Sequence, residues 1–191
     1  MMSMDISVII PLYNKAPHIT RAINSVMKQT EAATEIIVID DGSTDNSFDI
    51  VATLAEKNDI VTLHTQPNRG ASFSRNWGVE LAKSPYVAFL DADDEWKPEY
   101  LSSIQRLYHN YPDCGAYATS YEVIKEDSSK SFPRAVGVPP APWIGIIPNY
   151  FKMVQKGNPF YTSSIVFPKT IFYDIGGFPL GVRRGEDRML W

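Results

Sequence analysis

The sequence predicts an α/β fold, a mostly parallel mixed sheet with helices on both faces. Two patterns in the first 111 residues support this prediction. Short apolar runs alternate with longer segments in which apolar residues recur every three or four positions, as on one face of an amphipathic helix. The apolar runs lack polar alternation, which is typical of strands buried on both faces of a parallel sheet. Because parallel strands are joined by right-handed crossovers, we expect the strand order 3-2-1-4 at the centre of the sheet.

Eight elements are expected in this first part of the chain. Pro11 is expected to stop the first strand, because proline has no backbone N–H to donate to a neighbouring strand. The hydroxyls of Ser43 and Thr44 are expected to cap the second helix, which then runs to about Lys57. The predicted strands are residues 6–11, 35–39, 60–64 and 86–90, and the predicted helices are 17–29, the segment after the turn at 42–45, 71–83 and 98–111.

The regular alternation weakens after Pro112. Five prolines between positions 128 and 148 are too many for a regular element, so this stretch is predicted to be a long loop. The other elements predicted here are strands at 115–123 and 160–167 and a short helix at 169–174 that Gly176 and Gly177 close.

Length and composition describe an ordinary soluble protein. The 191 residues suffice for one domain with a sizeable core and not comfortably for two. Hydrophobic residues make up 44% and charged residues 21% of the chain, which is usual for globular proteins. The net charge of −4 argues against sequence-independent binding to nucleic acid or to an anionic membrane. A single cysteine, Cys114, excludes an internal disulfide and agrees with a reducing compartment.

The sequence also bears on where the protein resides. Residues 1–11 lack the basic start and long apolar core of a secretory signal. No apolar run approaches the roughly 20 residues of a membrane-spanning helix. We therefore expect a cytoplasmic protein without a transmembrane segment, which leaves room for peripheral binding at the inner face of the membrane.

Four acidic side chains follow the fourth predicted strand: Asp91, Asp93, Asp94 and Glu95. Open α/β sheets bind their ligands at the carboxyl ends of the strands, which is where these side chains should lie. Asp91 and Asp93 are two positions apart, so both point to the same side of an extended chain. Two like charges this close favour a bound cation. Oxygen ligands alone suit Mg or Mn, with water and substrate phosphates completing the coordination.

This acidic run has two other interpretations. It could be a solvated turn before the helix that begins near Pro98, a residue well suited to a first helical turn. A calcium-binding EF-hand loop is excluded, because Trp96 stands where glycine is required and Ser102 where glutamate is required.

Asp41 and Arg75 are further candidates for a ligand site. Asp41 follows the second strand and could accept hydrogen bonds from a base or a ribose, or it could be a turn or cap aspartate. Arg75 lies one helical turn after Gly70 and could hold a phosphate or a carboxylate through two hydrogen bonds. A surface salt bridge is the alternative for Arg75.

Taken together, these motifs closely resemble the family 2 inverting glycosyltransferases, which have the A-type, Rossmann-like fold of nucleotide-diphospho-sugar transferases. A dehydrogenase of the Rossmann type is disfavoured, because no Gly-x-Gly-x-x-Gly follows the first strand. The resemblance extends from about residue 7 to residue 191. It rests on residues 7–14, 37–45, 68–70, 75–78, 89–94, 176–178 and 185–187, which occur in the order found in the family.

The resemblance implies roles for particular residues. Pro11 and Tyr13 match positions that pack against the nucleotide base, and Asp41 matches the residue that reads the base edge. Arg75 matches an arginine that contacts the nucleotide. The Asp91-Ala92-Asp93 segment matches the Asp-x-Asp signature, with Asp91 towards the ribose and near the metal, Ala92 in the nucleotide site, and Asp93 as a direct ligand of Mn or Mg. Asp187 matches the catalytic base, Glu186 lies beside it near the acceptor, and residues 176–178 match a segment on the acceptor side.

The resemblance also implies an activity. A sugar would pass with inversion from a nucleoside-diphosphate sugar, most commonly a UDP-sugar in this family, to a hydroxyl of a saccharide or lipid-linked saccharide, in polysaccharide or glycoconjugate biosynthesis. The chain is expected to be one catalytic-domain fragment, with a sugar-donor half at 1–111 and an acceptor half at 112–191. The alternative function is a non-catalytic module that binds nucleotide-sugar or carbohydrate, which would have no use for Asp187.

Overall fold

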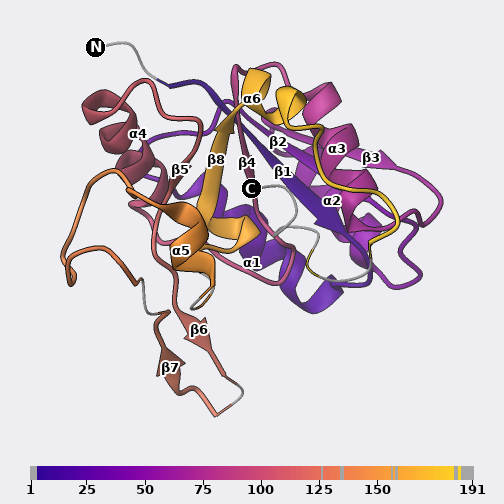
Figure 1. Ribbon diagram of the computed structural model, residues 1–191. Coiled ribbons are helices and arrows are strands. Elements are labelled where there is room, and N and C mark those ends of the chain that lie inside the picture. Colours follow the sequence, from indigo (N-terminus) through magenta and orange to yellow (C-terminus); the bar gives the residue numbers. More distant parts are fainter. Residues whose placement is uncertain are drawn as a thin grey trace.

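The computed structural model describes residues 4–125, 127–133, 136–155, 157, 159–182 and 185. At its centre is a six-stranded sheet with the order β3-β2-β1-β4-β8-β5 (Figure 1). The first four strands are parallel, whereas β8 runs antiparallel to both β4 and β5. The predicted order 3-2-1-4 is therefore confirmed, and β8 makes the sheet mixed. The strands are β1 (Ile6–Leu12), β2 (Glu35–Asp40), β3 (Val61–Thr65), β4 (Tyr86–Phe89), β5 (Tyr117–Ala118) and β8 (Ile165–Pro168).

Helices cover both faces of the sheet, as predicted. Along β1 and β2, alternate side chains enter two separate hydrophobic layers: Ile10 and Val38 lie in one, and Ile9 and Ile37 in the other. This two-sided burial explains why the strands read as unbroken apolar runs. The first layer is completed by α1 (Ala16–Met27), α2 (Ser47–Ala55) and α4 (Tyr100–Asn110), and the second by α3 (Ala71–Leu81) and α6 (Lys169–Asp174).

Helix α3 lies directly on β1 because of Gly78. A Cβ atom at this position would lie 2.4 Å from Cγ2 of Ile9, closer than two carbon atoms can approach. The absence of a side chain thus lets the helix backbone contact the strand. The same helix carries Arg75 one turn earlier, so this contact also fixes how far Arg75 stands from the sheet.

The prediction that Pro11 stops β1 is wrong, because the strand continues to Leu12. The carbonyl of Ile9 accepts a hydrogen bond from Leu90, and the carbonyl of Leu12 accepts one from Asp41. Successive residues of a parallel strand face its two neighbours alternately, so Pro11 faces the side of β4. The ladder with β4 has already ended at the pair Ile9 and Phe89. The missing N–H of Pro11 therefore lies where that ladder ends, and β1 continues to Leu12 through its pairing with β2.

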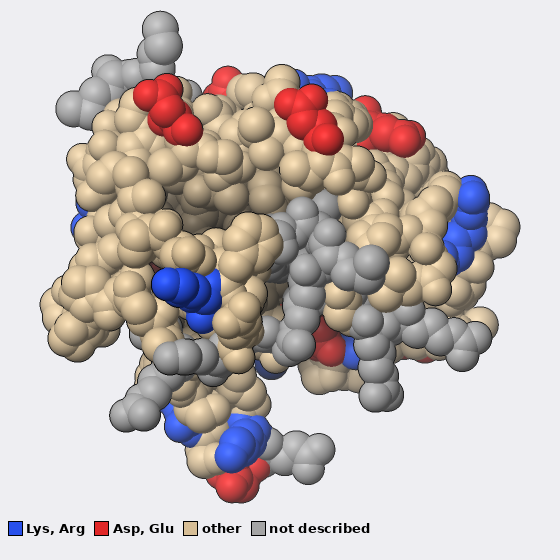
Figure 2. Space-filling view, viewed as in Figure 1, with Lys and Arg blue, Asp and Glu red and all other residues tan. Residues whose placement is uncertain are grey.

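The second half of the chain departs further from prediction. The strand expected at 115–123 is only the two-residue β5, and the strand expected from 160 begins at Ile165, after the 3₁₀ turn η1 (Thr162–Ser164). A small hairpin, β6 (Val123–Ile124) with β7 (Lys130–Ser131), enters the predicted loop and projects from the body of the molecule (Figure 1). In Figure 2 this hairpin carries side chains of both charges. Helix α5 (Tyr150–Val154) was not predicted, since five residues are too few to show helical periodicity.

Helix α6 matches its predicted bounds, and glycines close it as expected. The N–H of Gly177 donates to the carbonyl of Phe172, and the N–H of Gly176 donates to that of Tyr173, both at 3.0 Å. This pair of hydrogen bonds is the Schellman arrangement of a helix end. Within the described residues, no helix has the length and apolar character needed to cross a bilayer.

Candidate functional site

The carboxyl ends of β1, β2 and β4 lie at one edge of the sheet. In the register of the strands, Leu12 lies opposite Asp40 and Ile9 lies opposite Phe89. The loops that leave these three strands therefore start side by side, which is where open α/β sheets bind ligands. This edge brings together Pro11 near the end of β1, Tyr13 just after it, Asp41 after β2, and Asp91, Ala92 and Asp93 after β4.

Asn14 ties the loop after β1 to the loop after β2. Its side-chain Oδ1 accepts a hydrogen bond from the Thr44 N–H at 2.8 Å, and its own N–H donates to Oγ of Ser43 at 3.0 Å. The backbone of Asn14 has φ of +51°, a left-handed conformation that asparagine tolerates. These contacts position the preceding residue, Tyr13, which remains 46% exposed. An aromatic ring held at the ligand edge but not covered by the protein is free to stack on a planar group.

The expected capping of α2 by Ser43 and Thr44 is wrong. Both side chains are engaged with Asn14, and the first turn of α2 is held by Asp45, whose Oδ1 accepts the Ser47 N–H at 3.0 Å. Hydrogen bonding from Ser47 holds the pKa of Asp45 below its ordinary value. A carboxylate is the stronger acceptor and complements the helix dipole, which explains why Asp45 takes the position.

Asp41 is buried and holds the start of α3. Its Oδ1 accepts hydrogen bonds from the Arg69 N–H and from Nε2 of Gln66, and its Oδ2 accepts one from the Gly70 N–H, each at 2.8 Å. Gly42 follows with φ of +74°, and a Cβ there would lie 3.1 Å from the Asn68 nitrogen. These hydrogen bonds fit the alternative prediction for Asp41, a turn or cap aspartate. A carboxylate has about four acceptor positions, so contact with a base edge stays a prediction that this geometry permits.

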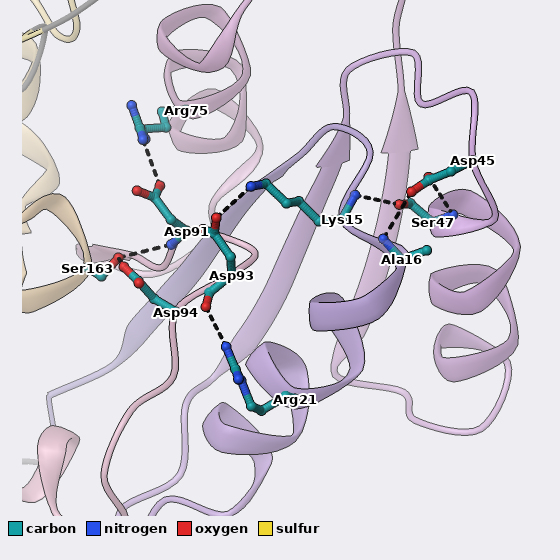
Figure 3. A network of polar contacts seen from close by, with 10 residues as sticks. All are labelled: Lys15, Ala16, Arg21, Asp45, Ser47, Arg75, Asp91, Asp93, Asp94 and Ser163. Carbon is teal, nitrogen blue, oxygen red and sulfur yellow. Dashed lines mark hydrogen bonds and ion pairs between the residues drawn. The ribbon is translucent and has the colours of Figure 1, made fainter. Parts of the chain in front are cut away.

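Arg75 and Asp91 form a largely buried ion pair rather than a surface salt bridge. Nη2 of Arg75 lies 2.7 Å from Oδ1 of Asp91, and the arginine is only 4% exposed (Figure 3). The guanidinium carbon also lies 5.0 Å from the centre of the Phe178 ring. Asp91 is thereby fixed at the rim of the site. Contact of Arg75 with a nucleotide stays a prediction.

Two basic side chains hold the acidic loop at residues 91–94: Lys15, which directly precedes α1, and Arg21, which lies within α1. Nζ of Lys15 lies 2.5 Å from Oδ2 of Asp93, and Nη2 of Arg21 donates to the Asp93 carbonyl at 2.6 Å (Figure 3). Partial burial disfavours the charged form of Asp93, but hydrogen bonding and attraction from Lys15 outweigh it, so the pKa of Asp93 lies below its ordinary value. Asp93 is therefore ionised at neutral pH.

Ser163 fastens the acidic loop to the second half of the chain, which the sequence did not reveal. Its Oγ accepts the Asp91 N–H at 3.1 Å and donates to Oδ2 of Asp94 at 2.6 Å (Figure 3). The Ser163 carbonyl accepts Nε1–H of Trp96 at 2.6 Å. Partial burial raises the pKa of Asp94, the Ser163 hydroxyl lowers it, and the charges of Asp91 and Asp93 raise it further. No spacing in the sequence connects a serine in η1 with a loop some seventy positions earlier.

Asn76 fixes the segment that follows α6. Its Nδ2 donates to the Phe178 carbonyl and its Oδ1 accepts the Phe178 N–H, both at 2.9 Å. This reciprocal pair places residues 176–178 beside α3, next to Arg75. Glu186 and Asp187, the predicted catalytic residues, lie outside the described residues.

The carboxylates at this edge suit a hard divalent ion that is only partly held by the protein. Among the described residues, no three His, Cys, Asp or Glu side chains converge as they would in a closed metal site. Asp93 nevertheless offers an ionised carboxylate that is 44% exposed, with Asp91 close to it in the chain. Mg, and Mn with the same oxygen preference, can be held by one or two carboxylates together with water and substrate phosphates. The residues present therefore fit such an ion.

Comparison with known proteins identifies one family. The family model described as Glycosyl transferase family 2 matches residues 7–178. An uncharacterized glycosyltransferase of Nostoc sp. (strain PCC 7120) is 47% identical over 106 residues, which cover 55% of this chain and 33% of that protein. The chain spans about a third of the length of several curated relatives it matches.

Two solved structures share this fold. Staphylococcus aureus TarS 1–349, in complex with UDP-GlcNAc, has a TM-score of 0.77 at 24% identity, covering 98% of this chain and 52% of that one. The mannosyltransferase PcManGT from Pyrobaculum calidifontis, in complex with GDP-Man and Mn²⁺, has a TM-score of 0.71 at 22% identity, covering 99% and 51%. At these identities the likeness concerns the fold, which is the A-type fold of nucleotide-sugar transferases.

Proposed function

The chain belongs to glycosyl transferase family 2, and from this premise we propose that it transfers a sugar, with inversion, from a nucleoside-diphosphate sugar to an acceptor hydroxyl. The observation that carries the proposal is the gathering of the family's motif residues at one sheet edge. Three neighbouring strands, β1, β2 and β4, are followed by Tyr13, Asp41 and the acidic loop at 91–94 respectively. Arg75 pairs with that loop through Asp91.

For the sugar donor, we propose a nucleoside-diphosphate sugar with UDP as the first candidate. The exposed ring of Tyr13, with Pro11 before it, is placed to pack on a flat base. Asp41 has acceptor capacity left for a base edge, and Asp91 lies at the rim, where a ribose hydroxyl could donate to it. The bound UDP-GlcNAc of TarS and the bound GDP-Man of PcManGT support donors of this class for proteins with this fold.

For the metal, we propose Mn or Mg held mainly by Asp93, with Asp91 nearby. When bound, such an ion would neutralise charge that gathers on the leaving diphosphate. Its remaining ligands would be water and the phosphates themselves. The protein's own part is to keep Asp93 ionised and its loop in place, which Lys15, Arg21 and Ser163 accomplish.

For the acceptor step, we propose Asp187 as the general base and Glu186 as a neighbour of the acceptor. A hydroxyl becomes a competent nucleophile when a carboxylate takes its proton during attack. Attack opposite the diphosphate inverts the sugar carbon and needs one base. The acceptor class proposed is a saccharide or lipid-linked saccharide, used in polysaccharide or glycoconjugate synthesis at the cytoplasmic side, with residues 1–111 holding the sugar donor and 112–191 facing the acceptor.

Calorimetry of nucleotide binding tests this proposal. UDP and GDP are titrated into the protein with Mn²⁺ and, separately, with EDTA. We expect binding that requires Mn²⁺ and that Asp93→Ala weakens about tenfold or more, the usual range for damage to a metal site. Glu95→Ala is the matched control, since this neighbouring carboxylate pairs with Arg21 at 3.2 Å and should leave affinity unchanged. Equal binding with and without Mn²⁺ would refute the metal-dependent site.

A further inference from the structure

Among the described residues, Lys15 is the one basic side chain on the carboxylate of Asp93, which it helps to keep ionised. The residue lies between β1 and α1, two positions after Tyr13. Its backbone is fixed, because its N–H donates to Oγ of Ser47 at 2.9 Å. The side chain leaves this anchored position and crosses to the acidic loop, 78 positions away in the sequence (Figure 3).

The ion pair of Lys15 and Asp93 is strong enough to form and weak enough to exchange. Its side chains are 40% and 44% exposed, so water screens their attraction. The neighbouring pair is different, because the side chain of Arg75 is only 5% exposed, so water screens its attraction to Asp91 far less. A divalent cation arriving at this edge would therefore displace Lys15 from Asp93 far more readily than Arg75 from Asp91.

An ammonium and a metal ion cannot both occupy the same carboxylate oxygen. Oδ2 of Asp93 is the atom that Lys15 contacts, and Asp93 is the proposed metal ligand. Once displaced, the ammonium stays within reach of this edge, because its backbone anchor does not move and its four-carbon stem rotates freely. The anion that would arrive with the metal is a diphosphate, which lysine binds as a point charge.

We propose that Lys15 is a sugar-donor-binding residue that exchanges partners. Its ammonium neutralises Asp93 before the site is loaded and moves to the diphosphate when a divalent ion takes the carboxylate. This inference rests on the proposed function. It adds a residue with two opposite effects: Lys15 competes with the metal alone and favours the nucleotide once the metal is present.

Two titrations on the intact protein separate these effects. The first measures Mn²⁺ binding without nucleotide, from the electron paramagnetic resonance signal of the free ion. Lys15→Met should bind Mn²⁺ up to about fivefold more tightly, the limit for losing a competing half-exposed ion pair. Lys97→Met is the matched control, because it removes one positive charge from the same loop region, where Lys97 pairs with Glu122 at 3.4 Å. It should bind Mn²⁺ like the wild type.

The second titration measures UDP and GDP binding by calorimetry at saturating Mn²⁺. Lys15→Met should bind about tenfold more weakly or worse, as expected for losing a hydrogen bond to a charged group. Lys15→Arg, which keeps the charge, should retain most of the affinity, and Lys97→Met all of it. Thermal unfolding of each variant confirms that the comparison is between folded proteins.

The outcomes distinguish this inference from the proposed function. If the wild type binds UDP or GDP with Mn²⁺ but Lys15→Met leaves either titration unchanged, the exchange of partners is refuted and the proposed function stands. If the wild type binds neither nucleotide with Mn²⁺, the proposed function fails and the role of Lys15 is refuted with it. Tighter Mn²⁺ binding together with weaker nucleotide binding is the result we expect.

Discussion

Replacing Asp41 by Asn should destabilise the protein by about 2–4 kcal/mol, because this buried carboxylate holds the start of α3. Three hydrogen bonds at 2.8 Å end on its two oxygens, two of them from backbone N–H groups. Asn keeps one acceptor and places an NH₂ group against an N–H donor. The loss of one hydrogen bond to a charged group is about 1.5–3 kcal/mol. The loss of a negative charge at a helix start adds about 0.3–1 kcal/mol.

Urea unfolding followed by circular dichroism measures this loss. With a slope of about 2–3 kcal/mol per M for a chain of this size, the midpoint should fall by roughly 1 M. Asp59→Asn, at the exposed turn before β3, makes the same chemical change without this set of hydrogen bonds and should shift the midpoint little. If both variants unfolded at the same urea concentration, α3 would not depend on Asp41 and the cap interpretation would be refuted.

Three further predictions concern the acidic loop, the proposed general base and the pH dependence of stability. Ser163→Ala should weaken Mn²⁺-dependent UDP binding several-fold and reduce stability by about 1 kcal/mol per lost hydrogen bond. An unchanged UDP affinity in calorimetry would show that the acidic loop keeps its position without Ser163. Asp187→Asn in the complete natural protein should slow sugar transfer by about 10² to 10⁴ while nucleotide affinity stays within a few-fold; loss of nucleotide binding would assign Asp187 to the metal instead. Because the pKa of Asp45 is lowered by folding, its stabilisation is present above about pH 4 and is lost as pH falls through the folded pKa. The urea midpoints of wild type and Asp45→Asn should therefore approach each other as pH falls below about 4, and a gap that stays constant as pH falls would contradict this.

The first half of the fold was predictable because its signals are local. Each strand is an apolar run and each helix an apolar periodicity, so an element can be recognised from a few neighbouring residues. Handedness and short connections then restrict the order of the strands. The error at Pro11 shows the limit of local rules. Whether a missing N–H ends a strand depends on the neighbour on its other side, and here β1 stays paired with β2 through Leu12.

The second half was less predictable because its elements are short. Strand β5 has two residues and α5 has five, too few for a period to appear. Their positions are set by contacts rather than by propensity: β5 exists because Tyr117 and Ala118 meet β8. The exception is α6, whose closing glycines mark a helix end in the sequence itself.

By itself, the sequence determined the α/β class, the strand order and the sheet edge at which Asp41, Asp91 and Asp93 meet, because these follow from periodicity and from parallel winding. Only the tertiary structure decided what each side chain touches there. Asp41 meets the N–H groups 28 and 29 positions later, Lys15 meets Asp93 78 positions later, and Ser163 meets the loop at Asp91 72 positions earlier. Such partners lie on different elements, and their distance in space depends on how the whole sheet and its helices pack.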